Sequence, residues 1–254
     1  MQPTPIPALS DNYIWSLGDG DGDWLLIDPG DAEPVMAALG DRPPPRAILL
    51  THHHDDHIGG VPALLAHWPG VPVHAPADPR IGHADRRIGG GDHVDAGRWR
   101  FEVLATPGHT VSHIAFHGHG LLFSGDTLFS LGCGRLFEGT PRDMLGSLDR
   151  LAALPDTTLV CCGHEYTLAN AAFARVVDPD NAALRRRQAQ ATTMRDQGHP
   201  TLPSTLGEER ACNPFLRIDA PAVRASVAAR APAAASDRVE AFAELRRWKD
   251  GFRA

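Results

Sequence analysis

The chain has 254 residues, with 24 lysines and arginines against 31 aspartates and glutamates, which gives a formal net charge of −7 at pH 7. Hydrophobic residues make up 43% and charged residues 22%, a composition that predicts a folded core and excludes disorder, coiled coil and collagen-like repeats. No apolar run approaches the roughly 18 residues that span a bilayer, and the negative charge disfavours nucleic acid. We therefore expect neither a membrane nor a nucleic acid as a partner.

The first half of the chain reads as strands alternating with short helices. Residues 12–17 and 23–28 predict a hairpin joined through a Gly/Asp turn at 18–22. The apolar run 47–50 has the length of a buried strand, and a helix is predicted over 61–67. Further strands are predicted at 71–74, 99–104, 113–116, 121–123 and 158–161, and helices at 142–153 and 166–176.

Composition changes near residue 177, beyond which the chain is rich in Ala, Arg and Gln and no convincing strand is predicted. The length fits one large domain or two modest ones. We therefore predict an α/β domain over residues 1–164 and a smaller helical domain over residues 165–254.

The cysteines indicate a reducing compartment. There are four of them, no Cys-x-x-Cys pair occurs, and a chain of this length does not need disulfides to fold. The first residues also lack the basic region and apolar stretch of a secretory signal. We expect reduced thiols and a cytoplasmic location; the cysteines are Cys133, Cys161, Cys162 and Cys212.

The segment 51–60, Thr-His-His-His-Asp-Asp-His-Ile-Gly-Gly, concentrates groups that bind metal ions. His52 and His54 are two residues apart, so in an extended loop both imidazoles project to one side. Asp56 and His57 follow where the chain turns towards a helix, which aims them in another direction. Imidazole with carboxylate is a donor set that suits zinc, iron or manganese.

Three later strands end in the same way, with a His or Asp next to glycine: His109, Asp126 and His164. If the strands are neighbours, these side chains gather at one edge of the sheet. Seven donors are too many for one tetrahedral ion and suit two, with Asp126 able to bridge them. The alternative is that these side chains are ordinary polar groups of turns and of the core. That alternative would explain a single histidine, but not polar groups at four strand ends, because uncompensated buried polar groups are costly.

The His52-x-His54-x-Asp56-His57 motif, followed in order by His109, Asp126 and His164, resembles the metallo-β-lactamase superfamily. Three further motifs narrow the resemblance to the glyoxalase II (hydroxyacylglutathione hydrolase) family, and it extends from residues 11–13 to residues 246–250. It implies an αββα sandwich followed by a helical domain. The three motifs lie at 132–140 (GCGRLFEGT), 162–167 (CGHEYT) and 213–217 (NPFLR).

The resemblance also implies a ligand set and a reaction. One metal ion would be held by His52, His54 and His109, the other by Asp56, His57 and His164, with Asp126 bridging them. Zinc is the expected metal, and iron or manganese would fit. Asp56 and Asp126 would be catalytic in a thioesterase that converts S-(2-hydroxyacyl)glutathione, typically S-D-lactoylglutathione, to glutathione and D-lactate, the second step of methylglyoxal detoxification. A monomer is the family-like expectation.

Glutathione carries two carboxylates, so an acidic chain that binds it needs a local cationic patch. Arg246 and Lys249, which is the sole lysine, are three residues apart and share a helix face. A solvated basic helix end is the alternative, but the resemblance assigns glutathione binding to both, with Tyr166 and Arg135 as further contacts. Arg135 stands where many relatives have lysine. Phe137 stands where some carry a substrate-binding tyrosine, which predicts one missing hydrogen bond.

Other interpretations of the same residues predict different chemistry. A glutathione persulfide dioxygenase with a single iron would use the same fold. A non-catalytic metal-binding module would have the same metal ligands but would catalyse no reaction. A β-lactamase fits less well because we expect no secretory signal, and a nuclease fits less well because the net charge is negative. A thiol nucleophile is disfavoured for the cysteines near the motifs. We expect His53 and Asp55 to point away from the ligands, and His113, His117 and His119 to be surface or supporting groups.

Overall fold

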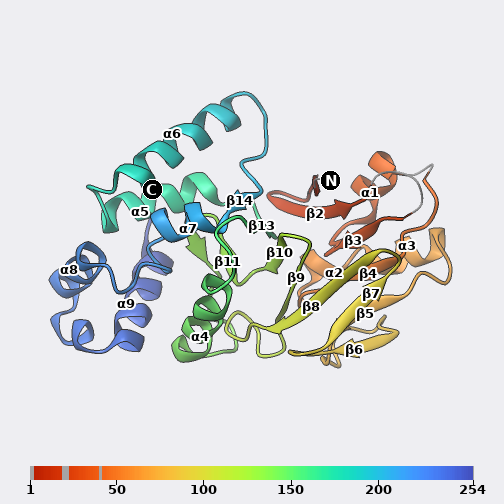
Figure 1. Cartoon of the computed structure of the whole chain (residues 1–254), viewed down its shortest axis with the longest axis horizontal. Helices are drawn as coiled ribbons and strands as arrows, with labels where there is room; N and C mark the ends of the chain where they lie inside the picture. Colours follow the sequence, from red (N-terminus) through yellow and green to blue (C-terminus); the bar gives the residue numbers. More distant parts are fainter. Residues whose placement is uncertain (1–2, 19–22, 40–41, 254) are drawn as a thin grey trace. The chain divides into compact units, whose positions relative to one another are not determined.

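The computed structural model describes residues 3–18, 23–39 and 42–253 (Figure 1). The chain folds into two compact units. The first unit comprises Met1–Ala105, Ser112–Gly125 and Cys161–His164, and the second comprises Thr106–Val111, Asp126–Val160 and Glu165–Ala254. No helix among the described residues is both long enough and apolar enough to cross a membrane.

The first unit contains a six-stranded sheet in which the strands follow one another in chain order. The first three strands pair antiparallel and the others pair parallel. The predicted hairpin is therefore confirmed, although residues 19–22 of its turn lie outside the described residues. The strands are β1 (Thr4–Ala8), β2 (Asn12–Leu17), β3 (Leu25–Ile27), β4 (Ala47–Leu49), β5 (Val73–Pro76) and β6 (Arg86–Ile88).

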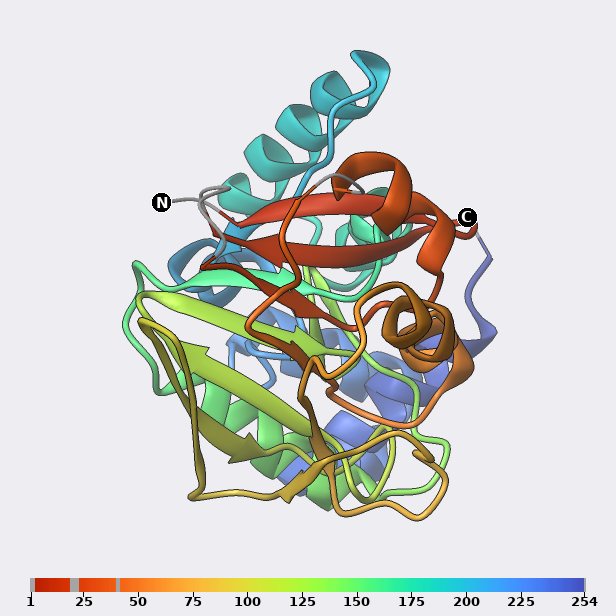
Figure 2. The ribbon, with the colours of Figure 1, turned by 90° about the vertical axis from the view of Figure 1, so that its right-hand side faces the viewer.

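Helices α1 (Ala32–Leu39) and α3 (Val61–His67) lie against this sheet (Figure 2). Val35 and Leu64 are fully buried in one apolar cluster with Leu26 and Ile48 of the strands. Burial of this apolar surface is the main force that holds the helices on the sheet. The predicted helix over 61–67 is confirmed.

A second sheet of the first unit contains β7 (His93–Ala96), β8 (Trp99–Ala105), β9 (Ile114–Gly118) and β10 (Leu121–Gly125), followed by the end of β13 (Leu159–Cys162). Its aromatic face meets the first sheet: the ring of Trp15 on β2 lies 6.4 Å from that of Phe123, which lies 5.8 Å from that of Phe101. All three side chains are buried. Two sheets thus share one core, as in a sandwich.

The second unit is mainly helical. Aromatic rings from three of its segments form a core, with Phe215 lying 6.1 Å from Phe173 and 5.9 Å from Phe242. The helices predicted at 142–153 and 166–176 are confirmed within one residue at each end. The helices are α4 (Pro141–Ala152), α5 (Thr167–Val177), α6 (Ala182–Asp196), α7 (Leu206–Cys212), α8 (Pro221–Arg230), the 3-10 helix η1 (Pro232–Ser236) and α9 (Arg238–Gly251).

The expectation that no strand follows residue 177 is wrong, and some strands nearer the N-terminus lie outside the predicted runs. A strand does occur beyond residue 177, since β14 (Ser204–Thr205) pairs with Leu159 and Val160. A strand of two residues is too short to show a periodic pattern in the sequence, so only its pairing with β13 identifies it as a strand. The strand β1, which contains Pro5 and Pro7, was also not predicted; it lies at the edge of its sheet, where proline is tolerated because no donor is needed on the outer side.

Candidate functional site

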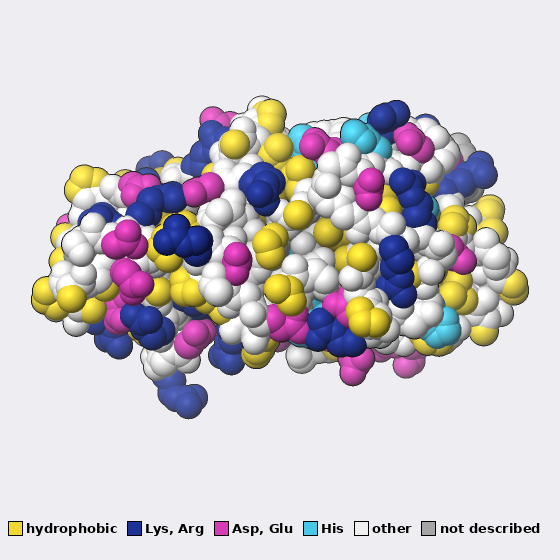
Figure 3. Space-filling model, turned by 90° about the horizontal axis from the view of Figure 1, so that it is seen from below, with side chains coloured by type: hydrophobic (Ala, Val, Ile, Leu, Met, Phe, Trp, Pro, Cys, Tyr) yellow, Lys and Arg dark blue, Asp and Glu magenta, His cyan; other side chains and the backbone are white. Residues whose placement is uncertain are grey.

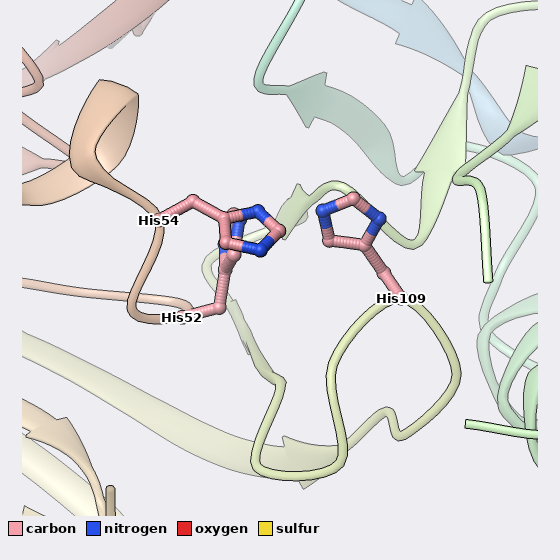
Figure 4. Close-up of side chains that lie close together, drawn as sticks. All are labelled: His52, His54 and His109. Carbon is pink, nitrogen blue, oxygen red and sulfur yellow. The ribbon is translucent and has the colours of Figure 1, made fainter. Parts of the chain in front are cut away.

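The loop between β4 and helix α2 (Asp55–Ile58) carries the first predicted ligands. His52 is fully buried, and its Nε2 lies 3.1 Å from Nδ1 of His54, so the two imidazoles do project together as the alternation predicts (Figure 4). Asp56 and His57 lie in the single turn of α2. Two imidazole nitrogens at this separation need a shared proton or a cation next to them.

Asp56, His57 and His164 form a compact group within the first unit. One ligand atom from each lies within 4.8 Å of the others. Oδ2 of Asp56 is 3.6 Å from Nε2 of His57 and 3.4 Å from Nε2 of His164. Two imidazoles and one carboxylate converging in this way match the three protein ligands of a catalytic zinc-type site.

Asp28, which follows β3, orients two of the histidines that are predicted to bind metal. Its Oδ1 accepts the backbone N–H of Thr51 at 2.8 Å, and its Oδ2 accepts the Thr51 hydroxyl at 2.7 Å and Nδ1–H of His57 at 3.1 Å. The Thr51 oxygen in turn lies 3.0 Å from Nδ1 of His52. Because Asp28 can only accept, we assign the proton of His57 to Nδ1, which leaves Nε2 with a lone pair for a metal ion.

His164 and Asp56 have partners at the start of β2. Nδ1 of His164 lies 2.8 Å from Oδ1 of Asp11. The Asn12 amide donates to Oδ2 of Asp56 at 3.0 Å and to its carbonyl at 3.1 Å. Asp11 fixes His164 in the same tautomer as His57, and Asn12 fixes the carboxylate, so the group is oriented before any ion binds.

His109 and Asp126 lie together in the second unit, His109 on the loop that follows β8 (Figure 4). Nε2 of His109 is 3.5 Å from Oδ2 of Asp126, and its Nδ1–H donates to the carbonyl of Arg135 at 2.9 Å. A Cβ on Gly134 would lie 1.9 Å from the Asp126 carbonyl oxygen, so only glycine allows this approach. His109 therefore also has Nδ1 held by an oxygen and Nε2 on the side of Asp126.

These histidines share one feature that fits them for metal binding. In each of His52, His57, His109 and His164, Nδ1 has a hydrogen-bonding oxygen beside it. This arrangement, with Nδ1–H held by an oxygen and Nε2 turned inward, is the usual support for a histidine that ligates a metal. The nitrogen and carboxylate donors suit zinc, iron or manganese.

Two of the predicted glutathione-binding cations share one carboxylate in the second unit. Asp250 Oδ1 lies 3.0 Å from Nη2 of Arg246 and 3.7 Å from Nε of Arg135. Arg246 is only 4% exposed, and its Nη1 donates to the Cys133 carbonyl at 2.7 Å. A solvated basic helix end therefore does not describe Arg246.

Lys249 lies beside these groups on α9. Its Nζ donates to the Ala169 carbonyl at 3.2 Å. Burial, with the nearby charges of Arg246 and Arg135, lowers the pKa of Lys249 to about 8. On the face shown in Figure 3, basic side chains are interspersed with acidic ones. The predicted cations are thus a local cluster.

Phe137 and Tyr166, the remaining predicted contacts, differ in exposure. Phe137 is 63% exposed, and its ring lies 5.2 Å from that of His109 in an edge-on arrangement. Tyr166 is half-buried at the start of α5, and its ring lies 5.2 Å from that of Phe129. Phe137 therefore places an accessible apolar ring beside a predicted ligand.

The cysteines are all free and buried. Burial raises the pKa of Cys133 to about 11 and that of Cys161 well above its ordinary value, so both remain thiols at neutral pH. The expectation that no cysteine acts as the nucleophile agrees with these environments.

The supporting histidines differ among themselves. His113 is buried and stacks on His52 with ring centroids 4.8 Å apart, so a surface position is wrong for it. His117 is half-buried and His119 is exposed. His53 turns towards Asp78, with Nδ1 3.5 Å from Oδ2, as the alternation along the loop predicts.

Sequence reasoning missed Asp28 and Asp11 as supporting residues and did not assign a role to Asn12. Asp28 carried a usable signal, because it follows an apolar strand and precedes Pro29 and Gly30, the same pattern that pointed to the ligands. Asp11 and Asn12 precede or begin a strand and carry no such signal. Their role follows from pairing of residue 12 with residue 164.

The fold and the site define a member of the metallo-β-lactamase superfamily, and residues 12–164 match the model of that superfamily. Residues 165–252 match the model described as hydroxyacylglutathione hydrolase C-terminus. A hydroxyacylglutathione hydrolase of Xanthomonas axonopodis pv. citri is 57% identical over 255 residues, with 100% of both chains covered. The chain belongs to the hydroxyacylglutathione hydrolase, or glyoxalase II, family. The expected fold, a metallo-β-lactamase sandwich with a C-terminal helical region, is confirmed.

Solved structures agree with this placement. ETHE1 from Myxococcus xanthus is 25% identical and superposes with a TM-score of 0.66 over 100% of this chain and 92% of that one. A protein named TTHA1623, solved in a di-iron-bound form, is 33% identical with a TM-score of 0.52 over 65% of this chain and 92% of that one. Both are far less similar than the hydroxyacylglutathione hydrolases.

Proposed function

We propose that this chain is a thioesterase that hydrolyses S-(2-hydroxyacyl)glutathione, typically S-D-lactoylglutathione, to glutathione and D-lactate. This is the second step of methylglyoxal detoxification. The observation that carries the proposal is the oriented group of Asp56, His57 and His164 in a chain 57% identical to hydroxyacylglutathione hydrolases. The three motifs at 132–140, 162–167 and 213–217 are present in the same chain.

The cofactors we propose are two divalent ions, with zinc expected and iron or manganese also suited to the donors. One ion would be held by His52, His54 and His109. The other ion would be held by Asp56, His57 and His164, and Asp126 would bind both ions. Support comes from the shared tautomer of the histidines and from the di-iron form of a relative. Such ions would supply a Lewis acid for the thioester carbonyl and would lower the pKa of water to about 7.

Asp56 and Asp126 are the proposed catalytic residues. One oxygen of Asp56 is held by the amide of Asn12, which fixes the direction of the carboxylate. From that position Asp56 would orient the attacking water and accept its proton. The leaving group is a thiolate, which departs without a strong general acid, so no further acid is assigned.

The glutathione moiety would be bound by the cationic cluster, Arg135, Arg246 and Lys249. Arg246 is pre-oriented by the Cys133 carbonyl, and its second nitrogen could exchange Asp250 for a substrate carboxylate. Tyr166 would add a hydroxyl. Phe137 has none, so the affinity for glutathione should be lower than in a relative with tyrosine at this position.

We further propose that the chain acts as a monomer in the cytoplasm. Support for the location comes from its four free, buried thiols, which a reducing compartment preserves. Glutathione thioesters would be available in the same compartment. Sedimentation of the purified chain would test the oligomeric state directly.

The deciding experiment is hydrolysis of S-D-lactoylglutathione by the purified protein, measured as thiol release, with glutathione persulfide and an oxygen electrode in parallel. Rapid thiol release without oxygen uptake supports the thioesterase. Oxygen uptake with little thioester cleavage would keep the fold and the ligands but would replace the reaction by persulfide oxidation. In Asp126→Ala, unchanged metal content together with unchanged turnover would contradict the bridging role of Asp126.

A further inference from the structure

The hairpin formed by β11 (Leu128–Phe129) and β12 (Gly132–Cys133) is enclosed by the C-terminal helices of the second unit. Its turn consists of two residues, Ser130 and Leu131. Asn170 on α5 donates to the Ser130 carbonyl at 3.0 Å, and Arg187 on α6 donates to the Ser130 hydroxyl at 3.3 Å. The turn is therefore fixed by side chains far away in the sequence.

Glu209 of α7 and Asn213, the residue that follows this helix, also make close contacts to the hairpin. The side-chain amide of Asn213 donates to the Phe129 carbonyl at 3.1 Å and to the Gly132 carbonyl at 2.9 Å. Oε2 of Glu209 accepts the backbone N–H of Leu131 at 2.7 Å. Asn213 and Glu209 are both fully buried, where hydrogen bonds are strong and their loss is costly.

The turn needs this support because Leu131 has a left-handed backbone, with a φ of 59°. A residue with a Cβ is held in that region only when its surroundings demand it, at a cost of roughly 1–2 kcal/mol. The Leu131 side chain is buried in an apolar cluster with Ala171, Leu184 and Cys212. Side-chain burial and the Glu209 hydrogen bond therefore act together on one strained residue.

The other end of the same hairpin leads directly to two proposed ligands. Gly134, next after β12, donates to the Thr127 carbonyl at 3.1 Å and packs so closely on Asp126 that a Cβ would lie 1.9 Å from its carbonyl oxygen. The Arg135 carbonyl accepts Nδ1–H of His109 at 2.9 Å. A shift of the hairpin would therefore move His109 and Asp126 together.

We infer that Asn213 and Glu209 are positioning residues which, by fixing the β11–β12 turn, hold His109 and Asp126 in the geometry that binds metal. The inference rests on the proposed ligand set and gives the NPFLR motif at 213–217 a role in the reaction. The C-terminal region thus has a second task besides binding glutathione. Burial raises the pKa of Glu209, and the hydrogen bonds from the Leu131 N–H, Ser204 and Ser130 and the charge of Arg187 oppose that rise.

The test compares Asn213→Ala with Ser226→Ala. Ser226 also donates one side-chain hydrogen bond to a backbone carbonyl of the second unit, that of Val177 at 2.7 Å, and among the described residues it has no hydrogen bond to the hairpin or to a proposed ligand. Zinc affinity is measured by competition with a chromophoric chelator, and bound zinc by elemental analysis. We expect Asn213→Ala to bind one ion at least tenfold more weakly, in the range found when supports of metal ligands are removed. Ser226→Ala should match the wild type.

Glu209 supplies a second pair of variants in case Asn213→Ala does not fold. Glu209→Gln keeps an oxygen for the Leu131 N–H and should retain zinc affinity, whereas Glu209→Ala should weaken it several-fold. Folded variants that all bind zinc like the wild type would overturn the inference. A wild type that binds zinc but does not cleave the thioester would instead contradict the proposed function, and the zinc comparison would still decide the positioning role.

Discussion

Asp28→Asn isolates the effect of a histidine tautomer from that of folding. Asp28 has a φ of 51°, a conformation that asparagine also tolerates, and its side chain is buried. Asparagine can keep its carbonyl oxygen on the Thr51 N–H. Its NH2 group then replaces Oδ2, which accepts from the Thr51 hydroxyl and from Nδ1–H of His57. The hydroxyl can rotate to accept, but His57 must move its proton to Nε2 or lose its partner.

The expected effects on stability and on metal affinity differ in size. Loss of a charge-assisted acceptor, with the Thr51 hydroxyl able to reverse, should lower the free energy of unfolding of the metal-free protein by about 1–2 kcal/mol. A proton on Nε2 of His57 removes a ligand lone pair from the group with Asp56 and His164. Metal affinity should therefore fall by about 10–100-fold, as for other substitutions that remove the support of a metal ligand.

Chelator competition for zinc and thermal unfolding in EDTA measure the two effects separately. Asp31→Asn is the matched control, because it makes the same kind of change three residues away and the Asp31 carboxylate accepts only from the Glu33 N–H among the described residues. It should leave zinc affinity unchanged. If Asp28→Asn bound two ions as tightly as the wild type, the assignment of the His57 proton to Nδ1 by Asp28 would be refuted.

Three further predictions concern the second unit. Because the pKa of Lys249 is lowered to about 8, its positive charge is present below that pH and lost above it. KM for S-D-lactoylglutathione should therefore rise between pH 7 and 9 while kcat stays constant, and Lys249→Arg should flatten the rise in KM. An equal rise in KM for the wild type and for Lys249→Arg would contradict the assignment. Burial raises the pKa of Cys133 to about 11, so this thiol should resist iodoacetamide at pH 7.5, and Cys133→Ser should keep at least about half of kcat. If iodoacetamide inactivated the wild type rapidly but not Cys133→Ser, Cys133 would be a reactive thiol. Thr140 caps α4 through a reciprocal hydrogen-bond pair with Asp143. Thr140→Ala should therefore lower the free energy of unfolding, measured by denaturant titration, by about 1 kcal/mol without changing the zinc content. A loss of zinc would show that α4 supports the proposed ligands.

Predictions from sequence succeeded where the signal was local. The alternation of His52 and His54 follows from spacing along the chain, so it could be predicted directly. The strands at 12–17 and 47–49 and the helix at 61–67 have regular apolar patterns of sufficient length. The strand β14 has two residues and could not be predicted, since only pairing with β13 makes it a strand.

The environment of a predicted residue was harder to foresee than its identity. Arg246 was expected on a cationic helix face, yet it is buried against the Cys133 carbonyl, 113 residues away in the chain. His113 was assigned to the surface or to a supporting role, and its stacking on His52 depends on how β9 packs beside β4. Such contacts join segments that no periodicity relates.

The sequence by itself determined which residues could bind metal and at which strand ends they occur, because a ligand must be a His or a carboxylate and a strand end must be followed by a turn. Tertiary structure alone decided which nitrogen of each of His57, His109 and His164 lies against a hydrogen-bonding oxygen. Asp28, Asp11 and the Arg135 carbonyl reach their histidines across 29, 153 and 26 residues, respectively. The sequence indicates candidate ligands through their spacing along the chain. The protonation and orientation of these side chains depend on hydrogen bonds that exist only once distant segments have packed together.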